Sequence, residues 1–301
     1  MSHHHHHEHT PQLHNLNRAF LIGIGLNALF VIVEAVAGFY TDSLSLLTDA
    51  GHNLSDVASL ALALLAYKLA KLKATETFTY GYQKTTILVA LANAVILLIA
   101  IGGIGYEAVQ RLFHPEPVSG NIVAWVAAIG IVINGITAML FFRDKEKDLN
   151  LKGAYLHLAA DALVSLGVVV AGIVIYFTGW FWLDSVISFV IMLVIFFGTW
   201  HLLKDSLRLS LDGVPRNIDF PKVKAILAGI DGVKAVHHIH IWAISTTQNA
   251  LTAHLVIEKN TDPEIIKKAK DKLKHELSHQ NIQHITLETE FAGESCPTKE
   301  C

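Results

Sequence analysis

The sequence predicts a polytopic α-helical membrane protein with six transmembrane helices, followed by a small α+β cytoplasmic domain. Of the 301 residues, 52% are hydrophobic and only 16% are charged, whereas a soluble domain carries about 25% charged residues. The deficit is local, because long apolar stretches precede a final third of ordinary soluble composition. Short connectors between the apolar stretches favour antiparallel helix hairpins.

Six stretches in the expected membrane domain, residues 17–210, are long enough to cross a bilayer, which takes about 20 apolar residues in a helix. They are residues 19–39, 44–67, 86–109, 121–142, 154–178 and 181–203. With the N-terminus inside, eleven lysines and arginines fall on the inner side and only Arg111 on the outer side. Because basic residues accumulate on the cytoplasmic side, we expect the N-terminus and the C-terminal domain to be cytoplasmic.

Residues 213–291 have the pattern of a separate soluble domain. The expected elements are a helix over residues 221–228, strands over 236–244 and 250–257, a helix beginning at Pro263, and a strand over 282–289. Asp262 before Pro263 is a typical helix start, with an N-cap side chain followed by proline at the first position. The order α-β-β-α-β predicts a small ferredoxin- or metallochaperone-like sandwich with one open face.

The two termini, residues 1–16 and 292–301, are excluded from the predicted fold. The His3–His7 run with His9 is either an expression tag or a metal-collecting tail. Cys296 and Cys301 have a spacing that suits a zinc ligand pair, or they are two reduced thiols on a frayed end. The net charge of −3 and the lack of a basic stripe argue against nucleic-acid binding.

Ionisable residues inside two of the expected spans predict a metal site. His52 and Asp56 lie four residues apart in the second span, and His157 and Asp161 repeat that spacing in the fifth. Residues four apart share one face of a helix, and ionisable groups are costly in a bilayer unless they have a function. Asp49 is a candidate for orienting these ligands from behind, or for capping a helix.

Two imidazoles and two carboxylates suit the tetrahedral coordination of Zn²⁺. A divalent cation also neutralises the two buried carboxylates, which repel each other when no metal is present. The empty site should therefore take up protons, and metal binding should expel them. The ligand set thus predicts exchange of zinc for protons.

The chain resembles the cation diffusion facilitator family, specifically its bacterial zinc-exporting branch. The resemblance runs from about Asn17 to Glu290. The matching strings are SLSLLTDAGHNLSDVASL, TYGYQKTTILVALANA, HLAADALVSLGVVVAG, VHHIHIWAI and TAHLVI. It implies a homodimeric, alternating-access transporter in the bacterial inner membrane that exports Zn²⁺, with Cd²⁺ and Co²⁺ as companions. It also implies that the four ligands named above form the transport site.

The resemblance further implies a regulatory zinc site in the cytoplasmic domain, with His237, His254, Glu288 and Glu290 as ligands. His238 and His240 are additional candidates. Because side chains alternate along a strand, we expect His238 and His240 to share one face and His237 to point to the other. Relatives with cysteines in the tail use them as further ligands, which would involve Cys296 and Cys301. In the loop over residues 67–84, only Glu76 is acidic and there is no histidine, so no metal is expected there.

Three other functions compete with proton-coupled export. An intramembrane metalloenzyme needs an open coordination position and a general base, but four protein ligands fill this site and no HExxH string occurs. A passive metal facilitator would move metal without proton coupling, whereas the buried carboxylates favour proton coupling. A membrane-tethered metal sensor would need far fewer helices than six. We therefore expect a transporter and no enzyme.

Overall fold

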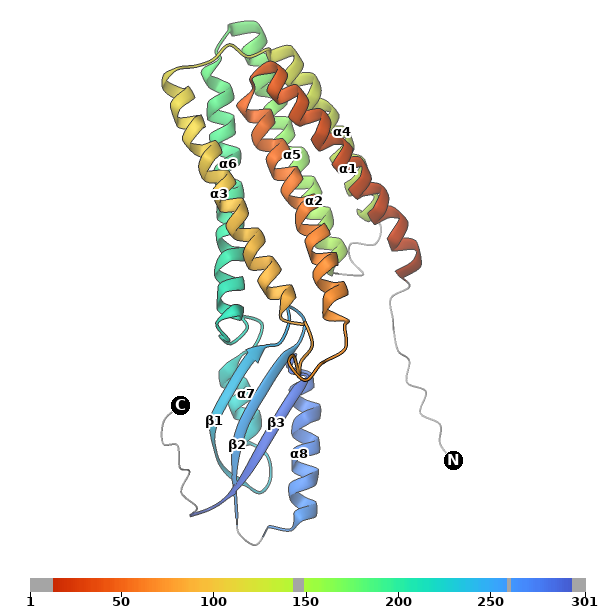
Figure 1. The fold of residues 1–301 in the computed structure, drawn as a ribbon, viewed down its shortest axis with the longest axis vertical. Coiled ribbons are helices and arrows are strands. Elements are labelled where there is room, and N and C mark those ends of the chain that lie inside the picture. Colours follow the sequence, from red (N-terminus) through yellow and green to blue (C-terminus); the bar gives the residue numbers. More distant parts are fainter. Residues whose placement is uncertain (1–12, 143–148, 259–260, 294–301) are drawn as a thin grey trace. The chain divides into compact units, whose positions relative to one another are not determined.

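The computed structural model describes residues 13–142, 149–258 and 261–293 and contains the predicted order of elements (Figure 1). The helices of the N-terminal part are α1 (Leu13–Thr41), α2 (Leu44–Ala70), α3 (Thr85–Phe113), α4 (Gly120–Phe142), α5 (Leu149–Thr178) and α6 (Trp182–Ser210). The C-terminal part contains α7 (Phe220–Ala228), β1 (Val233–Ala243), β2 (Asn249–Ile257), α8 (Pro263–Ser278) and β3 (His284–Phe291). Two compact units result: residues 13–60 with 97–198, and residues 61–96 with 199–293.

Six helices form where six spans are predicted, and four of them are long and apolar enough over their described residues to cross a bilayer. These are Thr85–Phe113, Gly120–Met139, His157–Thr178 and Trp182–Ser210. The described apolar part of α1, Gly25–Thr41, is shorter. Large apolar side chains such as Phe39, Trp125 and Phe177 are 74–79% exposed. Apolar surface on this scale needs a lipid environment.

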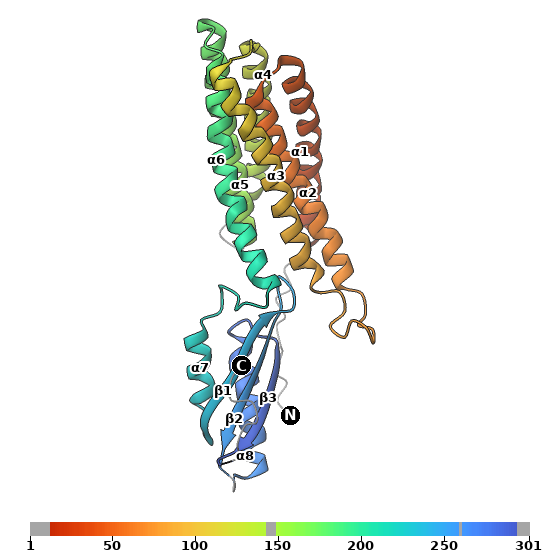
Figure 2. The same cartoon turned by 60° about the vertical axis from the view of Figure 1, so that its left-hand side comes forward.

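In the first unit, the helices run alongside one another in both ribbon views (Figures 1 and 2), and α4 packs very closely on α5. A Cβ atom at Gly172 would lie 2.7 Å from the backbone nitrogen of Ala124 and 2.8 Å from the carbonyl oxygen of Gly120. A Cβ at Gly120 would lie 2.5 Å from the carbonyl oxygen of Gly172. Glycine at both positions thus allows backbone-to-backbone contact, as is common between membrane helices.

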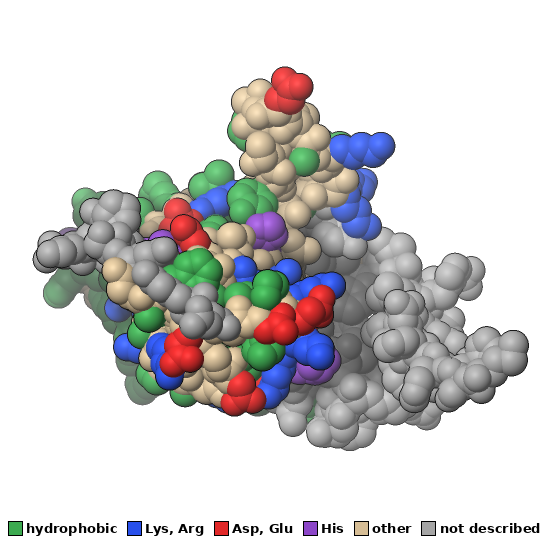
Figure 3. All heavy atoms as spheres, turned by 90° about the horizontal axis from the view of Figure 1, so that it is seen from below, with side chains coloured by type: hydrophobic (Ala, Val, Ile, Leu, Met, Phe, Trp, Pro, Cys, Tyr) green, Lys and Arg blue, Asp and Glu red, His purple; other side chains and the backbone are tan. Residues whose placement is uncertain are grey.

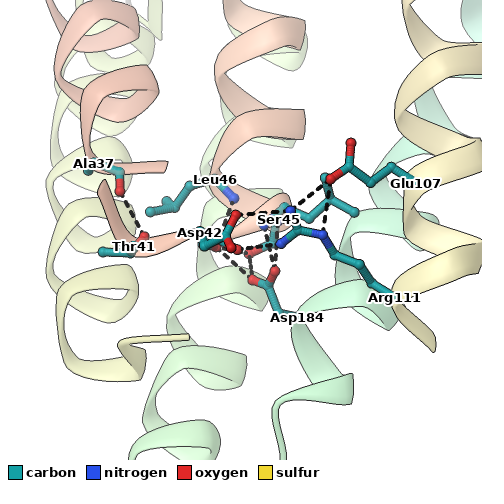
Figure 4. A network of polar contacts seen from close by, with 10 residues as sticks. Ala37, Thr41, Asp42, Ser45, Leu46, Glu107, Arg111 and Asp184 are labelled. Carbon is teal, nitrogen blue, oxygen red and sulfur yellow. Dashed lines mark hydrogen bonds and ion pairs between the residues drawn. The ribbon is translucent and has the colours of Figure 1, made fainter. Parts of the chain in front are cut away.

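The start of α2 is fixed by a carboxylate from α6. Asp184, 2% exposed, accepts hydrogen bonds from the backbone nitrogens of Leu44 and Ser45 at 2.6 and 3.2 Å. It also accepts from the hydroxyls of Ser43 and Ser45 (Figure 4). Beside it, Arg111 of α3 binds the carbonyl oxygen and the carboxylate of Asp42. Asp184 therefore satisfies backbone donors that would otherwise be unpaired at the N-terminus of α2.

In the second unit, a three-stranded sheet in the order β1-β2-β3 packs against α7 and α8 through one of its faces. β2 is antiparallel to β1 and parallel to β3. Leu251, Ala253 and Leu255 of β2 point into the core with Leu227 of α7 and Leu273 of α8. Since side chains alternate along a strand, His254 belongs to the opposite face. The predicted sandwich is confirmed.

The capping pattern that predicted α8 is also confirmed. Asp262 is the N-cap and accepts a hydrogen bond from the backbone nitrogen of Glu264 at 2.8 Å, with Pro263 at the first helical position. On the face drawn in Figure 3, acidic and basic side chains are interspersed, as expected of a solvated surface. In the same unit, Lys84 forms an ion pair with Asp212, and the ring of Tyr80 packs on the ring of His284.

The Gly172 contact gives a test of the α4–α5 packing. We expect Gly172→Ala to force the two backbones apart and to lower the melting temperature of the detergent-solubilised protein, because overpacking costs about 1–3 kcal/mol. The matched control is Gly167→Ala on the same helix, where a Cβ meets no atom within 4 Å. That substitution should leave stability unchanged or raise it, because alanine favours helix by up to about 1 kcal/mol. Equal melting temperatures for the two variants would contradict the packing described.

Candidate metal centre

The predicted metal ligands of the membrane domain are brought together by α2 and α5. Asp56 contacts both imidazoles, with its Oδ2 atom 3.7 Å from His52 Nε2 and 3.0 Å from His157 Nε2. Asp161 also contacts both, 3.4 Å from His52 and 3.6 Å from His157. The four side chains therefore form a closed ring in which imidazole and carboxylate alternate.

The geometry of the ring suits a small cation. One ligand atom each from His52, Asp56 and Asp161 lie within 4.8 Å of one another, and the rings of His52 and His157 are nearly perpendicular, with centroids 5.9 Å apart. The Asp161 side chain is 6% exposed, whereas His157 is 47% exposed. A site with one buried and one accessible side lets an ion enter from the accessible side and bind between the ligands.

A small, mainly apolar cavity adjoins His52. It is lined by Thr48, Gly51, His52, Leu97, Ala100, Ile101, Ile104, Met192 and Ile195. Its walls thus come from α2, α3 and α6, so His52 borders open space as well as the α5 ligands.

Behind the ring lies a layer of buried polar side chains. Asp49 is 1% exposed, and its Oδ2 atom accepts a hydrogen bond from the Ser165 hydroxyl of α5 at 3.3 Å. Asn53 donates from Nδ2 to Oε2 of Glu34 on α1, also at 3.3 Å. Sequence reasoning singled out Asp49 but not Ser165, because a serine on an apolar helix carries no signal of its own.

A second cluster of histidines and carboxylates lies on the sheet of the second unit, on the face away from α7 and α8. His254 of β2 donates from Nδ1 to Glu290 of β3 at 2.5 Å, and its Nε2 atom is 3.5 Å from Glu288. His237 of β1 donates from Nε2 to the other oxygen of Glu290 at 3.0 Å. Ligand atoms of His237, His254 and Glu290 all lie within 4.8 Å of one another.

The expected alternation of His237 and His238 is wrong. The β1–β2 register passes from His237↔His254 to His240↔Thr252, which leaves one extra residue on β1, and His238 has a φ of 50°. Such a bulge puts two successive side chains on one side of the strand. The His237 and His238 rings are 5.0 Å apart, and both lie about 5 Å from His254. The bulge thus adds His238 to the cluster, while the ring of His240 is 6.4 Å from that of His238.

The cluster perturbs the carboxylate at its centre. The hydrogen bond from His254 holds the pKa of Glu290 below its usual range, and the nearby His237 lowers it further. Glu290 is therefore ionised in the folded domain, ready to bind a cation. Cys296, Cys301 and the histidines of the N-terminal run lie outside the described residues.

Apolar helices that can span a bilayer, with a ring of two imidazoles and two carboxylates between two helices, define an integral membrane protein that handles a metal cation. The particular family follows from comparison with known proteins. The model of the cation efflux transmembrane domain matches residues 20–209, and that of the cation efflux protein cytoplasmic domain matches residues 215–290. The chain belongs to this family of transporters, the cation diffusion facilitators, as its motifs predicted.

Curated relatives match nearly the whole chain. The chain is 36% identical to the cadmium, cobalt and zinc/H(+)-K(+) antiporter of Bacillus velezensis over 93% of its length and 92% of the relative's. It is 38% identical to the metal cation efflux system protein CzcD of Cupriavidus metallidurans, with 91% and 87% covered. It is 34% identical to the zinc transporter ZitB of Escherichia coli, with 100% and 95% covered.

The lowered pKa of Glu290 predicts how acid affects the metal-free protein. A carboxyl with a lowered folded pKa stabilises the fold above its unfolded pKa, and the contribution is lost as pH falls through the folded pKa. We expect Glu290→Gln to lower the temperature at which the cytoplasmic domain unfolds at neutral pH and to match wild type in acid. Unfolding followed by hydrogen exchange in β2 and β3 measures this. A Glu290 variant that followed wild type at every pH would refute the assignment.

Proposed function

We propose that this chain is a secondary active exporter of divalent metal cations, with Zn²⁺ as the main substrate and Cd²⁺ and Co²⁺ as further ones, in exchange for protons. The observation that carries the proposal is the alternating ring of His52, Asp56, His157 and Asp161. Its donor set matches the nitrogen and oxygen ligands that zinc prefers. Two of the relatives are named for these substrates, one as a cadmium, cobalt and zinc antiporter and one as a zinc transporter, which supports the same choice.

Proton exchange follows because the carboxylates of the ring must be neutralised when no metal is bound. Each carboxylate lies within 3.7 Å of both imidazoles, so a protonated imidazole can neutralise the carboxylates when the cation has left. An arriving divalent cation competes with those protons for the same nitrogen and oxygen atoms. Each ion bound on the cytoplasmic side therefore displaces protons, and protons taken up from the outside displace the ion.

We place all six helices across a bacterial cytoplasmic membrane, with both termini in the cytoplasm. The eleven basic residues expected on the inner side, against Arg111 alone on the outer, support this orientation. The ring ligands of α2, His52 and Asp56, face those of α5. A homodimer, as the family resemblance implies, is part of the proposal.

We assign the cluster on the sheet to a regulatory zinc ion. His237, His254 and Glu290 supply the converging ligand atoms, Glu288 contacts His254, and the bulge brings His238 to the same side. A cluster in the cytoplasm is exposed to the zinc concentration that the transporter lowers. Zinc bound here can therefore match the rate of export to the cytoplasmic zinc concentration.

Reconstituted protein tests the proposal. Zinc and pH are recorded together inside liposomes, with wild type, Asp161→Asn and the control Glu116→Gln, an exposed carboxylate between α3 and α4. Wild type and the control should move zinc and protons in opposite directions. Asp161→Asn should lose both fluxes by about 100-fold or more, since even residues that only orient metal ligands are worth 10–100-fold in affinity.

The alternatives give different results in the same experiment. Zinc movement without opposing protons would make the chain a passive facilitator. Tight zinc binding with no movement in wild type would make it a membrane-tethered sensor. Full transport by Asp161→Asn would show that the ring is not the transport site.

A further inference from the structure

Two buried carboxyl groups lie side by side behind the metal ring. Glu34 of α1 is 0% exposed and Asp49 of α2 is 1% exposed. Asn53, which donates to Glu34, lies one helical turn after Asp49 on α2, so both carboxyls lie where α1 meets α2. Neither belongs to the ring, since the hydrogen bonds described for them involve Asn53 and Ser165.

Their hydrogen bonding is incomplete in a specific way. One oxygen of each carboxyl has a donor: Asn53 for Oε2 of Glu34 and Ser165 for Oδ2 of Asp49. The other two, Oε1 of Glu34 and Oδ1 of Asp49, are buried and have no donor among the described residues. Buried polar atoms are nearly always hydrogen-bonded. Two carboxylates can offer each other only acceptors, whereas a protonated carboxyl is a donor, so a single proton between them satisfies both oxygens.

The charges around the pair also call for a proton. No described lysine or arginine forms an ion pair with Glu34 or Asp49. The charged groups that the ring places on this side are His52, one turn from Asp49 on α2, and Asp161 of α5, which contacts His52. Two adjacent buried carboxyls without a cation cannot both be ionised.

We infer that Glu34 and Asp49 form a second proton-binding site, separate from the metal ligands, which holds one shared proton while the ring is free of metal. The inference rests on the proposed antiport function and adds a proton to it. A divalent cation brings two positive charges, so when it displaces one proton from the ring the net charge there rises by one, one helical turn from Asp49. The O–H bond then breaks, the electron pair stays on the carboxylate oxygen, and the proton leaves to solvent.

Counting protons tests this. Purified full-length protein in weakly buffered detergent is titrated with zinc, and the protons released per zinc bound are measured with a pH indicator. Glu34→Gln is the informative variant, because its amide can donate to Asp49 and still accept from Asn53, yet cannot titrate. We expect this variant to bind zinc as stoichiometrically as wild type but to release up to about one proton fewer per ion. The control Glu116→Gln should release as many as wild type.

Infrared spectroscopy gives a second readout. Metal-free wild type should have the C=O stretching band of a protonated carboxylic acid, which weakens when zinc is added and is missing in Glu34→Gln. If that variant does not fold, Asp49→Asn removes the same shared proton and serves in its place. Equal proton release and an unchanged band in the variant would overturn the inference alone. No proton release from wild type on zinc binding would overturn the antiport function and the inference with it.

Discussion

The cost of placing carboxylates among apolar helices governs this structure. Asp49, Asp161 and Asp184 are each no more than 5% exposed within the first unit, and each has been given partners. Asp184 receives the free donors at the start of α2, Asp161 faces two imidazoles, and Asp49 lies against a serine and a second carboxyl. Charge that lipid would not tolerate is thus paired with partners on neighbouring helices, and in the proposed transport site a metal cation can take the place of those partners.

Much of this could be predicted from the chain alone, because helical spacing fixes which side chains share a face. The pairs His52–Asp56 and His157–Asp161 were readable from their separation of four, and α8 from its capping residues. The bulge at His238 could not be predicted, because the strand register is set by pairing with β2. The sequence pattern of the strand does not reveal the extra residue. Glu34 lies in the first predicted span, but its position near Asp49 depends on how α1 packs on α2, which the sequence pattern does not fix.

The two clusters use the same chemistry in different surroundings. In the first unit, the ring is held between helices and shielded on the Asp161 side, so its ligands must be neutralised by protons or by metal. On the sheet, Glu290 lies near solvent and is kept ionised by His254 and His237. The first arrangement favours exchange of one cation for another, whereas the second favours reversible occupancy that follows the surrounding concentration.

At Gly120 and Gly172 no side chain separates α4 from α5, so the two backbones touch there. Sliding one helix along the other would bring backbone into backbone at this point, so we expect α5, with His157 and Asp161, to move together with α4. The other half of the ring belongs to α2, whose first turn is fastened to α6 through Asp184. A motion that separates α5 from α2 would divide the ring into its two imidazole–carboxylate pairs, His157–Asp161 on one helix and His52–Asp56 on the other.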